Sequence, residues 1–235
     1  MNILDIIYPK SCSICGRIGY YLCDDCKKLL KRNLPECYVC RRISPHYQTH
    51  EKCKKEGIFD SVFVGWEYND ISSIFLKKYK YGEVYDIASL LETLIPTITK
   101  DFQYINALEN VVVLPTPISS RRLRDRGFNQ TEKIAEIVAK ELGLEYLTNL
   151  LMDNDTSDTH QAFRDKEDRK SLRKDRFTVT DKEQITKYKN IIVVDDVITT
   201  GNTLNSIGKS IKESCTSSVS LHAFCLFRGK PNFSP

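Results

Sequence analysis

The sequence lacks any long apolar run. None of its 235 residues lies in a hydrophobic stretch that approaches the roughly 20 residues needed to cross a bilayer. The first ten residues also lack the basic start and small-residue cleavage site of a secretory signal peptide. We therefore expect a cytoplasmic protein that is not an integral membrane protein.

A strong excess of charge of one sign is also missing. The formal net charge is +4, and the first 55 residues alone hold eleven Lys and Arg against five Asp and Glu. Thiolates that bind a metal ion would offset part of this basic excess, so charge alone argues only weakly for nucleic acid. Apolar residues make up 41% and charged residues 28%, which excludes disorder of the whole chain and leaves enough apolar residues for a core.

Cysteine is nearly absent after residue 53. Of nine cysteines, only Cys215 and Cys225 lie beyond that point, and we expect both to be buried, inert thiols. The other seven join one histidine in four pairs of identical spacing: Cys12 and Cys15, Cys23 and Cys26, Cys37 and Cys40, His50 and Cys53. In a reducing compartment such pairs indicate metal ligands rather than disulfides.

Four pairs supply eight ligands, the number that two tetrahedral zinc sites require. Both sites are expected to be structural, because each would have a full ligand set and no open position. Spacing permits either adjacent or interleaved pairing of the four motifs. His46 lies near His50 and is an alternative ligand, and one of the two sites could be empty.

The remaining pattern predicts an α/β domain behind this module. We place the boundary near Gly57, which gives a zinc-binding domain at residues 1–57 and a second domain at residues 58–235. Strands are expected at residues 61–68, 111–114, 191–194 and 219–227, and helices at 84–99, 130–142 and after residue 203. The first strand could pair with a neighbour from the metal module. The alternation predicts a parallel sheet with right-handed crossovers, and the charged segment 153–176 is typical of a functional lid or a disordered loop.

The most informative segment covers residues 191–204. Asp195 and Asp196 follow an apolar strand, where ligands of open α/β sheets bind, and are placed to accept hydrogen bonds from ribose hydroxyls. The next loop leads into a helix start, where backbone N–H groups and hydroxyls can surround a phosphate; it contains Thr199, Thr200, Gly201, Asn202 and Thr203. The structural alternative is a strand end and a helix cap that bind no ligand.

Residues 191–204 resemble the signature of type I phosphoribosyltransferases, which bind phosphoribosyl pyrophosphate (PRPP). The resemblance implies a twisted parallel sheet flanked by helices, Mg²⁺ bound with PRPP, and catalytic roles for Asp195 and Asp196. A second strand and loop at residues 111–130 would contact pyrophosphate through Thr116, Arg122 and Arg126. Arginine forks suit phosphate, although the arginines of this loop could equally form a solvated helix face.

Further motifs resemble the ComF family over essentially the whole chain. They are Pro115-Thr-Pro117, Arg126-Gly-Phe-Asn-Gln130, Lys80-Tyr81, Gln161 with the basic stretch before Phe177, and the leading cysteine pairs. The resemblance implies a protein of natural transformation that handles single-stranded DNA in the cytoplasm. Residues matched to loop or DNA contacts are Lys80, Gln130, Gln161, Arg164 and Arg169. The asparagine usual in the family's basic stretch is absent here, which weakens any detailed role for that loop.

This family implies partners such as a DNA-uptake helicase or the inner-membrane DNA channel, and a location at the inner face of the membrane. An alternative is an active phosphoribosyltransferase that transfers to an unidentified base or nucleotide and has no connection with DNA. A third possibility is a protein that binds PRPP without turnover. No residue pattern in the sequence identifies an acceptor pocket.

Overall fold

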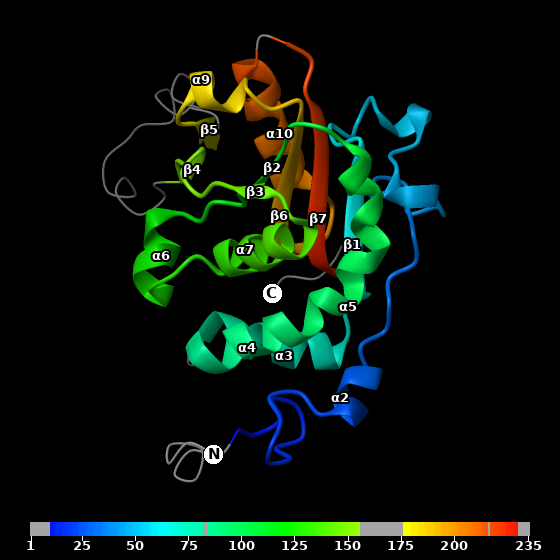
Figure 1. Cartoon of the computed structure of the whole chain (residues 1–235), viewed down its shortest axis with the longest axis vertical. Coiled ribbons are helices and arrows are strands. Elements are labelled where there is room, and N and C mark those ends of the chain that lie inside the picture. The colour runs from blue at the N-terminus through cyan, green and yellow to red at the C-terminus, as the bar shows by residue number, and fades with distance from the viewer. Residues whose placement is uncertain (1–9, 82–83, 156–175, 216, 230–235) are drawn as a thin grey trace, which may run out of the picture.

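The computed structural model describes residues 10–81, 84–155, 176–215 and 217–229. Its centre is a five-stranded sheet in the order β1-β7-β6-β2-β3, in which every neighbouring pair is parallel (Figure 1). The strands are β1 (Ser61–Glu67), β2 (Val111–Pro115), β3 (Glu145–Tyr146), β6 (Asn190–Ile198) and β7 (Ser220–Arg228). The parallel α/β sheet expected from the sequence is confirmed.

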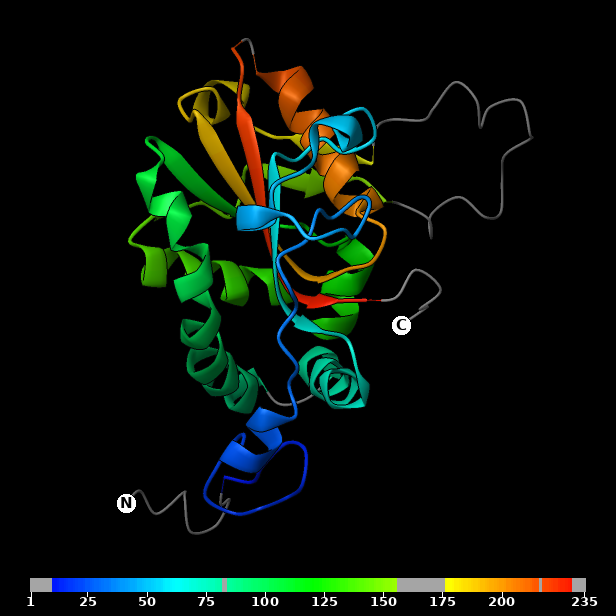
Figure 2. The same cartoon turned by 90° about the vertical axis from the view of Figure 1, so that its right-hand side faces the viewer.

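Helices cover both faces of this sheet, as Figure 2 shows. On one face, Ile134 of α7 (Gln130–Leu142) shares a core with Ile192 of β6. On the other face, Ile207 of α10 (Asn202–Ser214) shares a second core with Ile191. Because neighbouring residues of a strand point to opposite faces, a continuous apolar run such as that of β6 is what a strand buried on both sides requires.

The strand order reverses between β2 and β6. From β2 the chain passes through α7 to β3 on one side, whereas from β6 it passes through α10 to β7 on the other. Ligands of open α/β sheets bind outside the carboxyl ends of the strands at such a reversal. The fold therefore places the ends of β2 and β6 at the expected binding edge.

The bounds of α7 agree with the sequence prediction. The side chain of Asn129 caps the start by accepting a hydrogen bond from the backbone N–H of Thr131, and Gly143 ends the helix with a φ of 66°. A left-handed residue at this position is a common helix stop, and glycine adopts it without a steric cost. Local chemistry at both ends thus explains why this helix could be predicted closely.

The single helix expected over residues 84–99 is wrong in one respect. The structure has α4 (Val84–Leu94), then a short α5 (Pro96–Thr99), followed by the 3-10 helix η3 (Lys100–Ala107). Pro96 has no backbone N–H to continue α4, but proline suits the first turn of a new helix. Before α4 lies α3 (Asp70–Tyr81), and α6 (Ser120–Arg126) forms the arginine-rich connection after β2.

A second, two-stranded antiparallel sheet joins β4 (Leu151–Asp153) to β5 (Phe177–Val179), and the short helix α9 (Lys182–Ile185) follows. Arg176 forms an ion pair of 3.2 Å with Asp153, whose side chain is 1% exposed. These contacts hold together the two ends of the segment 153–176, which was expected to be a functional lid or a disordered loop. Residues 156–175 of that segment lie outside the described residues.

The amino-terminal segment packs along the outer edge of β1. It contains α2 (Asp24–Lys28) and the 3-10 helices η1 (Pro45–Tyr47) and η2 (Glu51–Cys53). Antiparallel bridges join Arg32 to Trp66 and Gln48 to Ser61, so the expected pairing of the first strand with the metal module is confirmed. In Figures 1 and 2 the part around α2 lies beyond α3, and the chain then runs along β1. The domain boundary near Gly57 stays a prediction.

Cys225 is fully buried in β7, as expected, whereas Cys215 is only half-buried because it lies beyond the last turn of α10. Among the described residues, no helix has both the length and the apolar composition that crossing a membrane requires.

Candidate functional site

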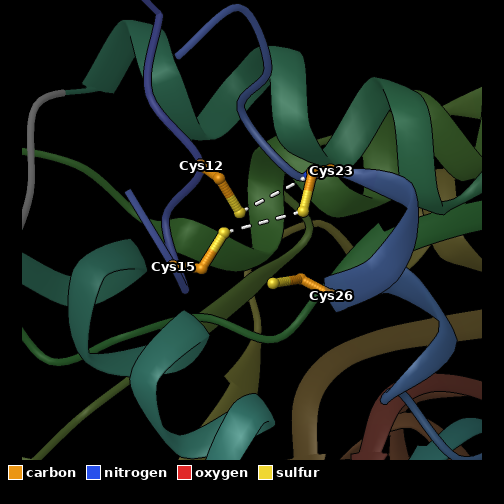
Figure 3. A group of neighbouring side chains, drawn as sticks. All are labelled: Cys12, Cys15, Cys23 and Cys26. Atoms are coloured by element: carbon orange, nitrogen blue, oxygen red, sulfur yellow. Dashed lines mark hydrogen bonds between the residues drawn. The ribbon is translucent and has the colours of Figure 1, made fainter. Parts of the chain in front are cut away.

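The first cysteine cluster joins the two amino-terminal pairs. The sulfur atoms of Cys12, Cys15, Cys23 and Cys26 all lie within 4.8 Å of one another, and Figure 3 shows the four side chains converging on one point. The backbone N–H of Cys23 also donates to the Cys12 sulfur over 3.5 Å. Four convergent sulfur atoms are the donor set of a closed, structural zinc site.

The second cluster joins the other two pairs. Its members are Cys37, Cys40, His50 and Cys53, again with ligand atoms within 4.8 Å of one another. The nearest histidine nitrogen to the Cys40 sulfur is Nδ1, at 3.3 Å. The structure therefore has adjacent pairing, one of the two arrangements that the sequence left open. His46 lies apart from this cluster, with its ring 5.4 Å from that of Tyr104.

Each cluster is built on a turn, and the two turns have the same backbone hydrogen bonds. In the first, the backbone N–H of Cys12 donates to Arg17 O and that of Gly16 donates to Cys12 O. In the second, the N–H of Cys37 donates to Arg42 O and that of Arg41 donates to Cys37 O. We call the two turns, residues 12–17 and 37–42, the first and the second knuckle.

The knuckles favour thiolates at their first cysteines. Burial acts to raise the pKa of the Cys12 thiol, but backbone N–H groups of the same turn donate to the sulfur and lower that pKa to about 6. The pKa of Cys37 is lowered in the same way. Burial and neighbouring thiols instead raise the pKa of Cys53 to about 11. A metal ion binds thiolates, so the donor types and the N–H groups at these turns both fit zinc.

The predicted phosphate loop lies between β6 and α10. Gly201 has a φ of 84° and is the residue before the first turn of α10, and its carbonyl accepts from the N–H of Asn205. Asn202 and Thr200 are exposed, whereas Thr199 and Thr203 are half-buried. The first N–H groups of this 13-residue helix have no partner inside the helix, and with the helix dipole they favour an anion at its start.

Asp195 and Asp196 were expected where the strand ends, and this is wrong, because β6 continues to Ile198. The extension is possible because β7 pairs with β6 as far as Ile198, whereas the pairing with β2 stops at Val194. Both aspartates therefore lie in a part of β6 that is open on the β2 side. Asp195 is 9% exposed and Asp196 is half-buried.

The loop after β2 lies beside this opening. The N–H of Thr116 donates to Val194 O over 2.8 Å, so Thr116 follows the last paired residue of β2. Its carbonyl accepts from the side chains of Asn129 and Thr131, which fixes the loop to the start of α7. The Thr116 hydroxyl is buried and has no hydrogen-bond partner among the residues that the structure describes.

The arginines of this loop differ in their surroundings. Arg126 is half-buried and donates to the Gln130 side chain over 2.9 Å, and Gln130 is itself buried at the start of α7. Arg122 is exposed on α6, as are Arg121 and Arg124. The structure thus brings Thr116, Arg126 and Gln130 into one region after β2, with Arg122 on the adjoining helix.

The predicted loop and DNA residues are described only in part. Lys80 lies in the last turn of α3, and its side chain is not among the parts described. Gln161, Arg164 and Arg169 lie outside the described residues. Their suggested roles stay predictions.

Sequence reasoning missed Tyr38 and Arg228. Arg228, at the end of β7, is 6% exposed, forms a 2.8 Å ion pair with Glu36 and donates to the Tyr38 carbonyl over 2.7 Å. A charged residue that ends the alternating apolar strand 219–227 was the one available signal for Arg228. For Tyr38 the cysteine spacing contains no such signal.

Comparison with known proteins finds a matching domain and two similar competence proteins. The model of the phosphoribosyl transferase domain matches residues 130–232. Competence protein F of Haemophilus influenzae is 27% identical over 195 residues, which are 82% of this chain and 84% of that protein. Competence protein ComFC of Streptococcus pneumoniae is 26% identical over 196 residues, covering 82% and 81%.

Among solved structures, the chain resembles glutamine PRPP amidotransferase from B. subtilis at 17% identity, with a TM-score of 0.42. The match covers 63% of this chain and 30% of that one. The similarity to competence proteins rests instead on the matched domain and the two relatives. This chain thus carries a type I phosphoribosyltransferase domain and is similar to competence proteins of the ComFC type over 82% of its length, and its amino-terminal segment carries two cysteine-rich clusters.

Proposed function

We propose that this protein binds Mg²⁺-PRPP at the carboxyl edge of its sheet and handles single-stranded DNA in the cytoplasm during natural transformation. The observation that carries the PRPP part is the position of Asp196, the loop 199–203 and Thr116 at the carboxyl ends of β6 and β2, where the strand order reverses. The names of the relatives, which are competence proteins, support the part in transformation.

The loop between β6 and α10 would hold the 5′-phosphate. The start of α10 supplies backbone N–H groups and a favourable dipole, and the threonines of the loop add hydroxyl donors. Gly201 has a positive φ of 84°, which glycine adopts without strain. Backbone N–H groups, hydroxyls and a helix start are the features that bind anions at the first turn of nucleotide-binding helices.

The aspartates would hold the ribose. Alternation along β6 puts Asp195 on the side of α10 and Asp196 on the side of α7. The half-buried Asp196 borders the opening beside β2, whereas Asp195 accepts a hydrogen bond of 2.9 Å from the N–H of Asp196. Asp196 is thus the more direct candidate for a ribose hydroxyl, and Asp195 fixes the backbone that presents it.

The loop after β2 would hold pyrophosphate. A buried hydroxyl without a partner is unfavourable, so the Thr116 hydroxyl is best explained by a ligand oxygen that accepts a hydrogen bond from it. Arg126 and Arg122 would add charge-assisted hydrogen bonds. Mg²⁺ bound with PRPP would neutralise further negative charge on the pyrophosphate.

Thr116→Val tests this assignment by calorimetric titration with Mg²⁺-PRPP. We expect the affinity to fall about tenfold, the size of one hydrogen bond to a charged group. The melting temperature without ligand should stay the same or rise, because the variant removes an unsatisfied hydroxyl. Thr186→Val is the matched control, because Thr186 follows α9 and lies before the amino end of β6, away from the carboxyl edge of the sheet. If wild-type protein fails to bind Mg²⁺-PRPP, the PRPP part of the proposed function is wrong.

Exposed arginines on α6 are candidates for the DNA backbone. Replacing Arg121, Arg122 and Arg124 by alanine should weaken binding of single-stranded DNA equally for different sequences. The slope of log affinity against log salt should fall by about 2, since each lost phosphate contact contributes about 0.7 for single strands. The matched control removes three exposed lysines at the other edge of the sheet: Lys182, Lys187 and Lys189. Equal losses in both triple variants would mean that only net charge matters.

A further inference from the structure

The second knuckle lies directly against the predicted phosphate loop. Tyr38, between the two cysteines of this knuckle, donates from its hydroxyl to the Asn205 side chain of α10 over 2.6 Å. Its ring lies against Gly201, where an added Cβ would come within 2.9 Å of a ring carbon. An aromatic side chain of the metal module therefore packs directly against the glycine that precedes α10.

The next contact comes from Arg41, which follows Cys40. Its guanidinium donates to the carbonyl of Thr199 over 3.3 Å and to that of Gly229 over 3.0 Å. Arg41 has a φ of 60°, which is unfavourable for a residue with a Cβ. The equivalent residue of the first knuckle is Gly16, with a φ of 77°. Glycine would suit both turns, so the arginine is best explained by what its side chain contacts.

Two further connections tie the knuckle to the sheet and the helix. Arg228 of β7 holds the Tyr38 carbonyl, as described above, at a point where β7 pairs with the end of β6. Asn205 donates to Glu56 O over 3.0 Å and accepts from the N–H of Ile58, so residues just after Cys53 also contact the first turn of α10. The second knuckle thus borders the phosphate loop, and its contacts with the loop come from Tyr38 and Arg41.

We propose that Tyr38 and Arg41 are positioning residues that hold the phosphate loop in its binding shape. Through them, the second metal cluster supports PRPP binding, whereas the first cluster does not. A loop held in place before binding spares the ligand the entropy cost of ordering it. The first knuckle cannot act in this way, because its counterpart of Arg41 is a glycine without a side chain. The proposal deepens the proposed function and rests on it for the identity of the ligand.

Arg41→Gly separates this role from ordinary stability. The variant gives the second knuckle the residue that the first one has, so it relieves the left-handed φ while removing both contacts of the guanidinium. We expect an unchanged metal content and an equal or higher melting temperature. Hydrogen exchange of the Asn205 N–H, which donates to the Gly201 carbonyl of the loop, should become about tenfold faster without ligand, and the Kd for Mg²⁺-PRPP should rise about tenfold.

Two other variants complete the test. Arg42→Ala removes the same charge one residue further along and should leave exchange and Kd at wild-type values. Tyr38→Phe keeps the ring on Gly201 but loses the bond to Asn205, so it should change both readouts in the same direction by about threefold to fivefold. If Arg41→Gly loses metal, Tyr38→Phe tests the positioning role in its place.

The outcomes distinguish this proposal from the proposed function. Unchanged exchange of the Asn205 N–H in both Arg41→Gly and Tyr38→Phe would overturn it, as would equal effects of Arg41→Gly and Arg42→Ala. If wild-type protein does not bind Mg²⁺-PRPP but exchange still rises in the variants, the positioning role stands and the PRPP site is refuted. Faster exchange with an unchanged Kd would refute the link to ligand binding.

Discussion

Mg²⁺-PRPP binding should be lost when Asp195 and Asp196 are both replaced by asparagine, while salt-sensitive binding of single-stranded DNA remains. Asparagine keeps the size of the side chain but removes its charge and one of its acceptor oxygens. Each charge-assisted hydrogen bond is worth about 1.5–3 kcal/mol, so the loss of two should weaken the affinity at least about 100-fold. DNA binding should persist, because cations rather than carboxylates hold the DNA backbone.

The measurement is a calorimetric titration beside a DNA-binding isotherm at several salt concentrations. The matched control is Asp24→Asn with Asp25→Asn, another adjacent pair of aspartates, exposed at the start of α2 and remote from the sheet edge. It should bind Mg²⁺-PRPP as wild type does. Equal loss of PRPP and DNA binding in the Asp195/Asp196 variant would contradict the separation of the two contacts. The single Asp196 variant should show the larger part of the effect, since this side chain borders the opening beside β2.

Elements whose sequence contains both an apolar pattern and its end signals were predictable. The helix over residues 130–142 has Asn129 at its start and Gly143 at its end, and the structure has the same bounds. The buried strands β2 and β6 appear as continuous apolar runs because both of their faces lie under helices. In these segments the local and the tertiary preferences agree, so the sequence alone suffices.

Elements that depend on a distant partner were not predictable. β3 has two residues and β4 and β5 have three each, too few to show any alternation, and they exist because neighbouring strands satisfy their backbone. The position of Asp195 inside β6 has the same origin, since β7 extends the strand by pairing to Ile198. The local sequence shows that the aspartates follow an apolar run. It cannot show how far a neighbouring strand goes on pairing with β6.

The metal module shows the same limit in another form. Spacing identified the eight candidate ligands, yet adjacent and interleaved pairing have identical spacing, so only the folded chain decides between them. Spacing also gave no sign that Tyr38 and Arg41 contact residues more than 150 positions away. The two knuckles look alike in sequence, and their different surroundings follow from the way residues 31–61 run along β1.

Removing the metal should unfold residues 1–57 before the rest of the chain. Several of the buried side chains in this segment are the cysteines themselves, including Cys12, Cys23, Cys26 and Cys37, so little apolar burial would remain to hold it. A structural zinc ion contributes about 10–16 kcal/mol in small zinc-binding domains. This is comparable with the free energy of unfolding of a whole typical domain, about 5–15 kcal/mol, so the segment should not stay folded once the zinc is removed.

Limited proteolysis after chelation is the measurement, with metal loss verified independently. Cleavage should appear first within residues 10–57, and unchanged proteolysis of this segment in metal-free protein would refute the prediction. Cys15→Ser and Cys40→Ser form a matched pair, because each removes the exposed cysteine of one knuckle. Both should lose metal and expose their own knuckle to protease. Only Cys40→Ser should also weaken Mg²⁺-PRPP binding, because only the second knuckle carries the side chains that contact the phosphate loop.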